Sequence, residues 1–236
     1  TETVTQLTNA LKPIALSEYK VSCSGSTAVN VVAHQDDDLL FINPEVYNDM
    51  SSNKCVRTIY LTAGDSGKNS YYWISRQAGV EQAYNYMLGN NINYPWTSNI
   101  VKLADNEYIK VASPKNRPDI SLIFFNLPDG NLDGSGFRSN NYQSLEKLLN
   151  GNIAMIGSVD NQSSYSKDSI VNAVESLINL YGPSIIRTQD NLSIYNTSDH
   201  SDHIAAGKIT TLAYNIYEQD KYQNLVKIPI YYYYGY

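Results

Sequence analysis

Apolar strand-like runs alternate with helical patterns along most of this chain, and no other feature constrains its fold as strongly. Runs rich in β-branched and aromatic residues predict buried strands at 27–33, 56–62, 120–125 and 184–188. Helical patterns fall at 38–50 with an interruption at Pro44, at 74–88, 140–150 and 167–181, and from His203 onward. Strands and helices in alternation form a parallel sheet covered on both faces. We therefore predict an α/β fold with a Rossmann-like, mostly parallel central sheet flanked by helices. At 236 residues the chain fits a single domain over 1–236.

Weaker patterns predict three further elements. A helical spacing within residues 1–22 is set by Leu7, Leu11, Ile14 and Leu16. Two short strands at 101–103 and 108–111 are expected to pair as a hairpin. The tyrosine-rich segment 227–236 predicts an edge strand.

All three histidines lie in two short acidic motifs, Ala33-His34-Gln35-Asp36-Asp37-Asp38 and Asp199-His200-Ser201-Asp202-His203. Imidazole and carboxylate groups together are typical zinc ligands, and histidine is also the usual acid or base near neutral pH. The first motif follows the strand at 27–33, so it lies at a carboxyl end, where open α/β sheets bind their ligands. The two motifs predict a metal-dependent catalytic site.

The spacing within the first motif favours a turn into a helix. His34 and Asp37 are three residues apart and converge if the chain begins a helix here. The aspartates at 36–38 are followed by Leu39, Leu40 and Phe41, which is typical of an acidic helix start. Simple helix capping by these aspartates is the alternative, and it requires no histidine on the strand side.

Residues 33–38 and 200–203 resemble the AHPDDE and HPDH signatures of the PIG-L/LmbE-like N-acetylglucosamine deacetylases. The order and spacing of the motifs extend the resemblance over nearly the whole chain. The sequence departs from the signatures at three positions: Gln35 and Ser201 replace prolines, and Asp38 replaces the glutamate.

The resemblance implies a role for each motif residue. It makes His34, Asp37 and His203 the ligands of Zn²⁺, or of another divalent transition metal, and leaves a fourth position for water. Asp36 would be the general base, and His200 would stabilise the oxyanion or protonate the leaving amine. Asp202 is then expected to orient a neighbouring imidazole from outside the ligand set.

Three further polar residues are candidates for outer contacts or substrate binding. Arg76 resembles a family arginine that faces the active site, with a surface ion pair as the alternative. Asp65 lies in a glycine-rich turn after the strand at 56–62, and Asp129 lies in the Gly/Asp-rich loop after the strand at 120–125. We expect Asp129 to contact a sugar hydroxyl rather than calcium, because that loop lacks the closing glutamate of an EF-hand. Tyr71 to Trp73 and Tyr94 to Trp96 are expected either to stack on sugar rings or to pack in the core.

The cysteines and sequons favour an extracellular protein. Cys23 and Cys55 each precede a predicted strand, so neighbouring parallel strands would bring them within disulfide distance; two separate buried thiols are the alternative. Asn161, Asn191 and Asn196 lie in possible N-glycosylation sequons. The first residue is Thr1, with no initiator Met or signal sequence, which suggests a processed mature form or an excised piece.

Charge and hydropathy exclude several classes of partner. A net charge of −6 and a pI near 5.0 argue against nucleic acid and anionic membranes. No apolar run approaches the roughly 20 residues of a membrane span. A dinucleotide cofactor is not expected, because no GxGxxG follows the first strand. The sequence leaves the oligomeric state open.

The leading hypothesis is a secreted zinc-dependent hydrolase that removes the N-acetyl group from a GlcNAc-containing glycan and releases acetate. Two other hypotheses are a carbohydrate-binding protein without turnover and a metal-dependent amidase acting on a non-sugar N-acyl substrate.

Overall fold

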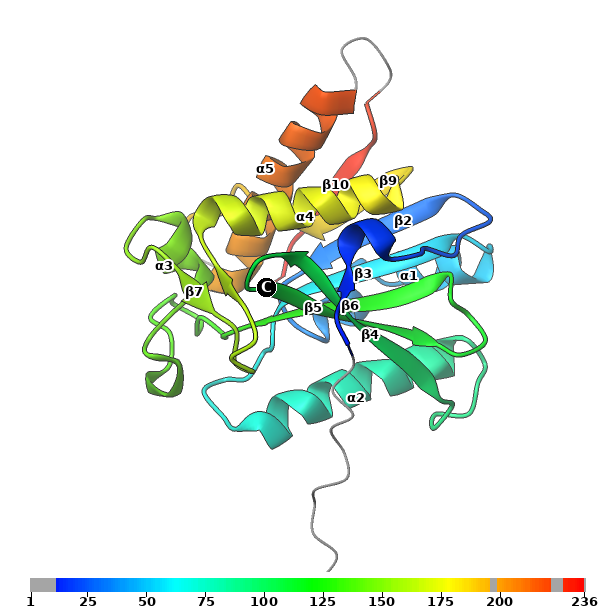
Figure 1. Ribbon diagram of the computed structural model, residues 1–236, viewed down its shortest axis with the longest axis horizontal. Helices are drawn as coiled ribbons and strands as arrows, with labels where there is room; N and C mark the ends of the chain where they lie inside the picture. Colours follow the sequence, from blue (N-terminus) through cyan, green and yellow to red (C-terminus); the bar gives the residue numbers. More distant parts are fainter. Residues whose placement is uncertain (1–11, 196–198, 222–226, 236) are drawn as a thin grey trace, which may run out of the picture.

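A computed structural model describes residues 12–195, 199–221 and 227–235. Its main feature is one eight-stranded sheet in the order β1-β4-β5-β6-β3-β2-β9-β10 (Figure 1). The strands are β1 (Ile14–Ala15), β2 (Thr27–Val32), β3 (Cys55–Thr62), β4 (Trp96–Ala104), β5 (Glu107–Pro114), β6 (Ile120–Leu127), β9 (Ile185–Gln189) and β10 (Ile230–Tyr233), with a separate small hairpin of β7 (Ile156–Gly157) and β8 (Ser164–Tyr165). Only β5 runs antiparallel to its neighbours in the large sheet. The predicted α/β fold with a mostly parallel sheet is confirmed.

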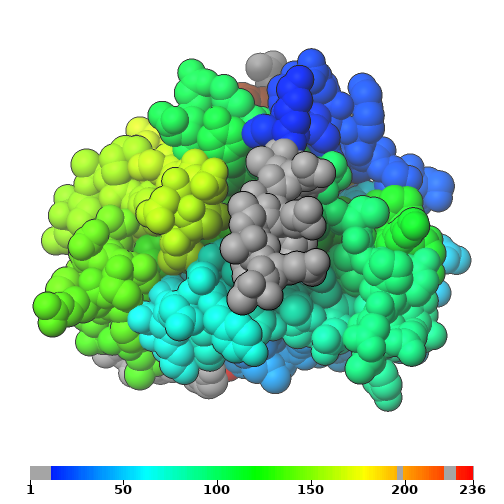
Figure 2. All heavy atoms as spheres, turned by 60° about the horizontal axis from the view of Figure 1, so that its bottom comes forward, coloured from blue at the N-terminus to red at the C-terminus, as the bar shows by residue number. Residues whose placement is uncertain are grey.

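Helices cover both faces of this sheet. They are α1 (Glu45–Ser51), α2 (Ser70–Met87), α3 (Leu145–Leu149), α4 (Lys167–Tyr181) and α5 (Ser201–Lys221), with shorter turns η1 (Leu16–Glu18), η2 (Asp38–Ile42) and η3 (Arg138–Asn140). One core cluster joins the sheet to α3, α4 and α5, and a second joins it to η2, α1 and α2. Figure 2 shows the face on which the cyan start of α2 lies forward, between the yellow-green part of the chain and the green β4–β5 hairpin. No helix in the described ranges is long and apolar enough to cross a membrane.

The pleat of β2 explains how one strand serves both core clusters. Val29 and Val31 point to the cluster with α4 and α5, and Val32 points to the cluster with α1 and α2. Alternate residues of a strand point to opposite faces, so a strand covered on both faces reads as a continuous apolar run. All six residues of β2 and all eight of β3 are buried.

The strand order places a switch point beside β2. The chain leaves β2 for β3 on one side, and β9 pairs with β2 on the other side. In open α/β sheets, ligands bind outside the carboxyl ends of the strands at such a point. The residues that follow Val32 and Gln189 are therefore expected to line a ligand-binding site.

The structure corrects several predicted elements. Ile14 belongs to strand β1 rather than to a helix, because it pairs with Val101 of β4; residues 1–11 lie outside the described ranges. The β4–β5 hairpin is longer than predicted, and β7 and β8 were not predicted. In the region 140–150, the α-helix is confined to Leu145–Leu149. The last long helix begins at Ser201, two residues before His203. As predicted, β10 is an edge strand.

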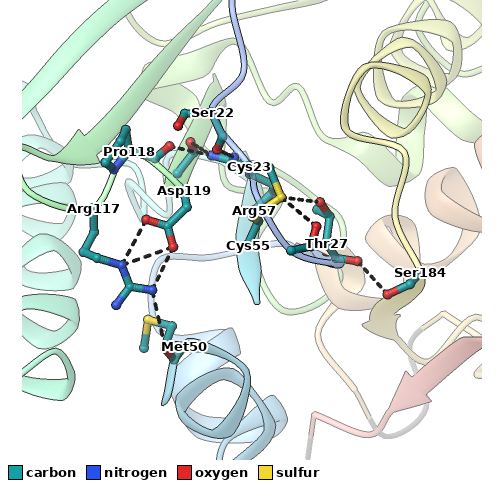
Figure 3. Close-up of a disulfide and its surroundings, with 12 residues drawn as sticks. Ser22, Cys23, Thr27, Met50, Cys55, Arg57, Arg117, Pro118, Asp119 and Ser184 are labelled. Atoms are coloured by element: carbon teal, nitrogen blue, oxygen red, sulfur yellow. Dashed lines mark hydrogen bonds and ion pairs between the residues drawn. A yellow bond between two sulfur atoms is a disulfide. The ribbon is translucent and has the colours of Figure 1, made fainter. Parts of the chain in front are cut away.

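A disulfide joins the amino ends of β2 and β3 (Figure 3). Cys23 precedes β2, Cys55 is the first residue of β3, and Thr27 of β2 pairs with Cys55 in a parallel register. The Cα atoms of the two cysteines are 5.8 Å apart, within the usual range for a disulfide. The predicted pairing of Cys23 with Cys55 is confirmed.

We expect the Cys23→Ser, Cys55→Ser double variant to lose about 3–4 kcal/mol of unfolding free energy, because the bond closes a loop and thereby restricts the unfolded chain. The sequence separation of 32 residues sets this magnitude. Urea denaturation of the variant and the parent protein measures the difference. Labelling of free thiols in the unreduced, denatured parent is the control, and two reactive thiols per chain would contradict the pairing.

Candidate active site

The first histidine motif leaves the sheet at the carboxyl end of β2. The Ala33 backbone N–H donates a 2.8 Å hydrogen bond to Oε1 of Gln189, which ties the end of β2 to the end of β9. Gln35 donates from Nε2 to the Thr62 carbonyl at 2.9 Å, which ties the motif to the end of β3. A proline at position 35 would lack this bond. The segment between β2 and η2 is therefore held from both neighbouring strands.

Three motif residues converge at this edge, and all three are buried. His203 Nε2 lies 3.2 Å from Asp37 Oδ1, and His34 Nδ1 lies 3.5 Å from Asp37 Oδ2. Single donor atoms of His34, Asp37 and His203 all lie within 4.8 Å of one another. The structure thus brings together the three residues that the resemblance assigned to the metal, from two motifs more than 160 residues apart in sequence.

The donor set and its spacing fit a zinc ion. Two ligands of a tetrahedral zinc, each about 2.0–2.1 Å from the metal, lie roughly 3.3–3.5 Å apart. The 3.2 Å between His203 Nε2 and Asp37 Oδ1 is close to that spacing, and the 3.5 Å from His34 Nδ1 runs to the other carboxylate oxygen, Oδ2. Two imidazoles and one carboxylate are also a common donor set at catalytic zinc sites.

A second carboxylate contacts the other nitrogen of each imidazole. Asp202 Oδ2 lies 3.2 Å from His34 Nε2 and accepts a 2.8 Å hydrogen bond from the Gly130 N–H. Asp199 Oδ1 lies 2.7 Å from His203 Nδ1. Such outer carboxylates fix the orientation and tautomer of metal-binding histidines. The predicted position of Asp202 beside an imidazole agrees with this geometry.

Sequence reasoning missed Asp199 as a site residue. It stands four residues before His203 at the start of α5, and residues with this spacing are neighbours on a helix surface. The i, i+4 spacing was the available signal. Its side chain is fully buried, which excludes a simple surface role.

The third histidine, His200, lies beside the other two. The ring centroids of His34 and His200 are 4.6 Å apart. His200 Nδ1 accepts a 3.1 Å hydrogen bond from the Asp202 backbone N–H, so its proton lies on Nε2. That Nε2 lies 3.8 Å from Asp129 Oδ1. His200 therefore offers one N–H donor beside the cluster.

Burial and neighbouring charges give the three imidazoles different pKa values. Burial lowers the pKa of His203, but hydrogen bonds with Asp199 and Asp37 outweigh it and raise this pKa to about 9. Burial likewise opposes protonation of His34, yet the charge of Asp37 and the bond to Asp202 raise its pKa well above 6.5. For His200 burial dominates and lowers the pKa to about 4. At neutral pH the metal-free site thus holds two charged imidazoles and one neutral one.

Asp36 lies at the rim of the site rather than in the buried cluster. Its side chain is 53% exposed, and its Oδ1 accepts a 2.6 Å hydrogen bond from Arg76 Nη2. Arg76 also donates from Nη1 to the Gly64 carbonyl at 3.1 Å, which anchors the guanidinium to the end of β3. Arg76 therefore holds the Asp36 carboxylate in one orientation, in line with its predicted position near the site.

The loops after β3 and β6 are joined by Asp65. Its Oδ1 accepts a 2.8 Å hydrogen bond from the Asp129 N–H. Its Oδ2 accepts from the Gly67 N–H at 3.1 Å and from Asn140 Nδ2 at 2.8 Å. Because Asp65 is buried and both its oxygens are bonded, it acts as a brace, and Asp129 is the member of this pair that faces the histidines.

Asp38, which stands at the glutamate position of the signature, points into the core. Its Oδ2 accepts a 2.7 Å hydrogen bond from the Tyr84 hydroxyl, which lies 2.8 Å from Thr58 Oγ1. Asn30 donates to the same Thr58 oxygen at 3.3 Å. Burial raises the pKa of Asp38 to about 7. Asp38 thus links the first motif to a buried polar chain that crosses β3 and β2.

The remaining candidates are placed as follows. Trp96 packs against Tyr84 and donates a 3.0 Å hydrogen bond to Asn85, so it follows the core alternative. Tyr71 is 82% exposed at the start of α2. Asn161 is exposed, and Asn191 is half-buried and donates to Thr211 at 2.8 Å. Asn196 lies outside the described residues.

Comparison with known proteins gives one family match and several similar structures. The profile of the family described as PIG-L, GlcNAc-PI de-N-acetylase, matches residues 29–214. No curated protein matches the chain.

Among solved structures, N,N'-diacetylchitobiose deacetylase from Pyrococcus horikoshii is similar at 13% identity over 89% of this chain and 61% of that one, with a TM-score of 0.46. The conserved protein TT1542 from Thermus thermophilus is similar at 14% identity over 89% and 66%, with a TM-score of 0.41. The 4-carboxy-2-hydroxymuconate hydratase GalB from Pseudomonas putida is similar at 13% identity over 86% and 62%, with a TM-score of 0.44. The chain thus spans 61–66% of the length of these three structures.

Proposed function

This chain belongs to the PIG-L family of GlcNAc-PI de-N-acetylases, and on that premise we propose that it is a zinc-dependent hydrolase that removes the N-acetyl group from a GlcNAc-containing glycan. The products are acetate and the free amine. We further propose that residues 1–236 form a single catalytic domain.

The observation that carries this proposal is the convergence of His34, Asp37 and His203. They come from two distant motifs, and one donor atom of each lies within 4.8 Å of the other two, close enough to bind one metal ion. Carboxylates behind both imidazoles strengthen the assignment, because such partners are usual for metal-binding histidines.

The proposed reaction divides the work among the metal and two side chains. A bound divalent metal supplies Lewis acidity, which polarises an acyl carbonyl and activates water. Asp36 accepts the proton of the attacking water, and Arg76 holds its carboxylate in place. His200 is neutral at pH 7 and carries its proton on Nε2, which suits it to donate a hydrogen bond to the developing oxyanion.

Acetate release from chitooligosaccharides, with and without a chelator, tests the proposal. We expect release that the chelator abolishes and added zinc restores; release that survives complete removal of metal would refute the metal mechanism. Glycan binding without acetate release at saturating zinc would instead support a binding protein. A parallel screen of N-acyl amino acids separates an amidase for non-sugar substrates from a sugar deacetylase.

We further propose that the protein is secreted. The Cys23–Cys55 bond supports this proposal, because disulfides typically form and persist in oxidising environments. Asn161 is exposed and is a candidate N-glycosylation site, together with Asn191 and Asn196. A mobility shift on glycosidase treatment of the protein from its natural source tests occupancy of these sequons.

We expect the affinity for zinc to rise with pH between 6.5 and about 9. His34 and His203 must lose their protons to bind a metal, and the pKa of His203 in the metal-free protein is about 9. Zinc binding at pH 7 should therefore release protons. Calorimetric titrations in buffers with different ionisation enthalpies measure this release. Binding at pH 7 without proton release would contradict the charged state of both imidazoles.

The stability of the metal-free protein should change in the opposite direction. A histidine whose pKa is raised on folding stabilises the fold while it is protonated. This stabilisation is complete below the unfolded-state pKa of about 6.5 and is lost as the pH rises through the folded-state value of about 9. The Tm of the metal-free protein should thus fall from pH 6.5 to pH 9, whereas the zinc-loaded protein, with neutral imidazoles throughout, serves as the control.

A further inference from the structure

The chain returns to the candidate site at its C-terminal end. Strand β10 pairs with β9 in a register that sets Tyr233 opposite Gln189, whose side chain holds the end of β2. The Asp190 N–H donates a 2.9 Å hydrogen bond to the Tyr233 carbonyl, which extends this pairing by one step. Figure 1 shows β10 running beside β9 towards the end of the sheet where α5 begins. Gly235, two residues beyond β10, is thereby brought to the second histidine motif.

Gly235 contacts the carboxylate that orients His203. The Gly235 N–H donates a 3.3 Å hydrogen bond to Asp199 Oδ2. The other oxygen of Asp199 accepts the His200 N–H at 2.7 Å and lies 2.7 Å from His203 Nδ1. Both partners of Oδ1 lie within five residues of Asp199, whereas Gly235 reaches Oδ2 from a different element. Among the described contacts of Asp199, the one from Gly235 alone ties it to the edge strand.

The fit at Gly235 leaves no room for a side chain. A Cβ atom built on Gly235 would overlap His203 Nδ1 and Asp199 Oδ1 and would lie 3.0 Å from Asp199 Oδ2. The backbone therefore lies directly against the Asp199–His203 pair, whose side chains are 0% and 1% exposed. A residue other than glycine would have to push the tail away from the pair, or push the pair itself out of position.

We propose that Gly235 is a positioning residue for the metal centre. By covering and bonding Asp199, it fixes the ring of His203 and so sets the affinity of the site for its metal. This inference rests on the proposed function in one respect, namely that His203 is a metal ligand. It assigns to the end of the chain a role that neither histidine motif contains.

The Gly235→Ala variant tests the proposal, with Gly79→Ala as its matched control. Gly79 lies exposed in the middle of α2, and a Cβ there would meet no described atom within 4 Å apart from the backbone of its own helix turn. Loss of a partner that orients a metal-binding histidine typically weakens metal binding about 10–100-fold. We expect a weakening of that order in Gly235→Ala and an unchanged affinity in Gly79→Ala, measured by competition with a chromophoric chelator.

Two further measurements separate positioning from a general effect on folding. The metal-free Gly235→Ala protein should still unfold in a single cooperative transition, and the visible absorption bands of its cobalt-substituted form should shift, because they report ligand geometry. In an Asp199→Ala background, the Gly235→Ala change should weaken metal binding less than it does in the parent, because only the overlap with His203 Nδ1 remains and the carboxylate through which Gly235 acts is gone.

The outcomes distinguish this inference from the function on which it rests. Parent protein that binds no metal would defeat the proposed function itself. Parent protein that binds zinc tightly, with Gly235→Ala binding equally well and giving an unchanged cobalt spectrum, would overturn only the role of Gly235. An equal effect of Gly235→Ala with and without the Asp199 carboxylate would likewise overturn it.

Discussion

Replacement of His203 by alanine is expected to remove most of the bound zinc and to lower kcat/KM for deacetylation by on the order of 10³-fold. The side chain is 1% exposed, its Nε2 faces Asp37, and its Nδ1 is held by Asp199. Lewis-acid stabilisation by a metal contributes several kcal/mol to such a transition state, and each 1.36 kcal/mol corresponds to a factor of ten in rate.

Metal analysis after dialysis, followed by kinetics with added zinc, checks this expectation. His200→Ala is the matched control. It removes an imidazole of the same motif that lies beside the cluster but is not one of the three proposed metal ligands. That variant should keep its zinc and lose mainly kcat. Stoichiometric zinc in His203→Ala would mean that the ligand set is wrongly assigned.

The Asp36→Asn variant should retain its zinc and lose turnover by on the order of 10²–10⁴-fold, the usual contribution of a general base. The substitution keeps the size of the side chain and a hydrogen-bond acceptor for Arg76, but it removes the group that accepts a proton.

An Asp→Asn change at an unrelated surface position is the control for this variant. Asp105 is 93% exposed and pairs only with Lys102 among its described ion-pair partners, so Asp105→Asn should leave both zinc content and kcat unchanged. Loss of zinc in Asp36→Asn, or a near-parental kcat, would show that the roles of Asp36 and Asp37 have been exchanged or misassigned.

The features that could be predicted from the sequence depend on residues close together in the chain or on a clear periodic pattern of apolar residues. Strands β2, β3, β6 and β9 were predicted because each is a short segment rich in apolar and β-branched residues, as expected for strands covered on both faces. The disulfide followed once two of these strands were taken as neighbours. The helical spacing around Ile14 misled, because the pairing of this residue with β4 depends on tertiary context that local pattern does not contain.

The candidate site divides in the same way. His34, Asp37 and His203 lie in recognisable motifs, and the structure brings them together. Asp199 was within reach of a spacing argument. Gly235 was not, because its approach to Asp199 depends on the register of β10 against β9, and a lone glycine near a tyrosine-rich terminus carries no local signal of that register. The hydrogen bonds to both oxygens of Asp65, through which it links the loops after β3 and β6, could not be predicted from the sequence either.

The covalent link between Cys23 and Cys55 lies at the opposite end of β2 from His34. Six residues of extended chain, each rising about 3.3 Å, put roughly 20 Å between the two ends of this strand. The exposed turn at Asn53, just before Cys55, therefore points away from the histidines. A dye, a bead or a solid support attached there would leave the opposite edge open to dissolved saccharides, so the protein could be immobilised on a surface in a working orientation.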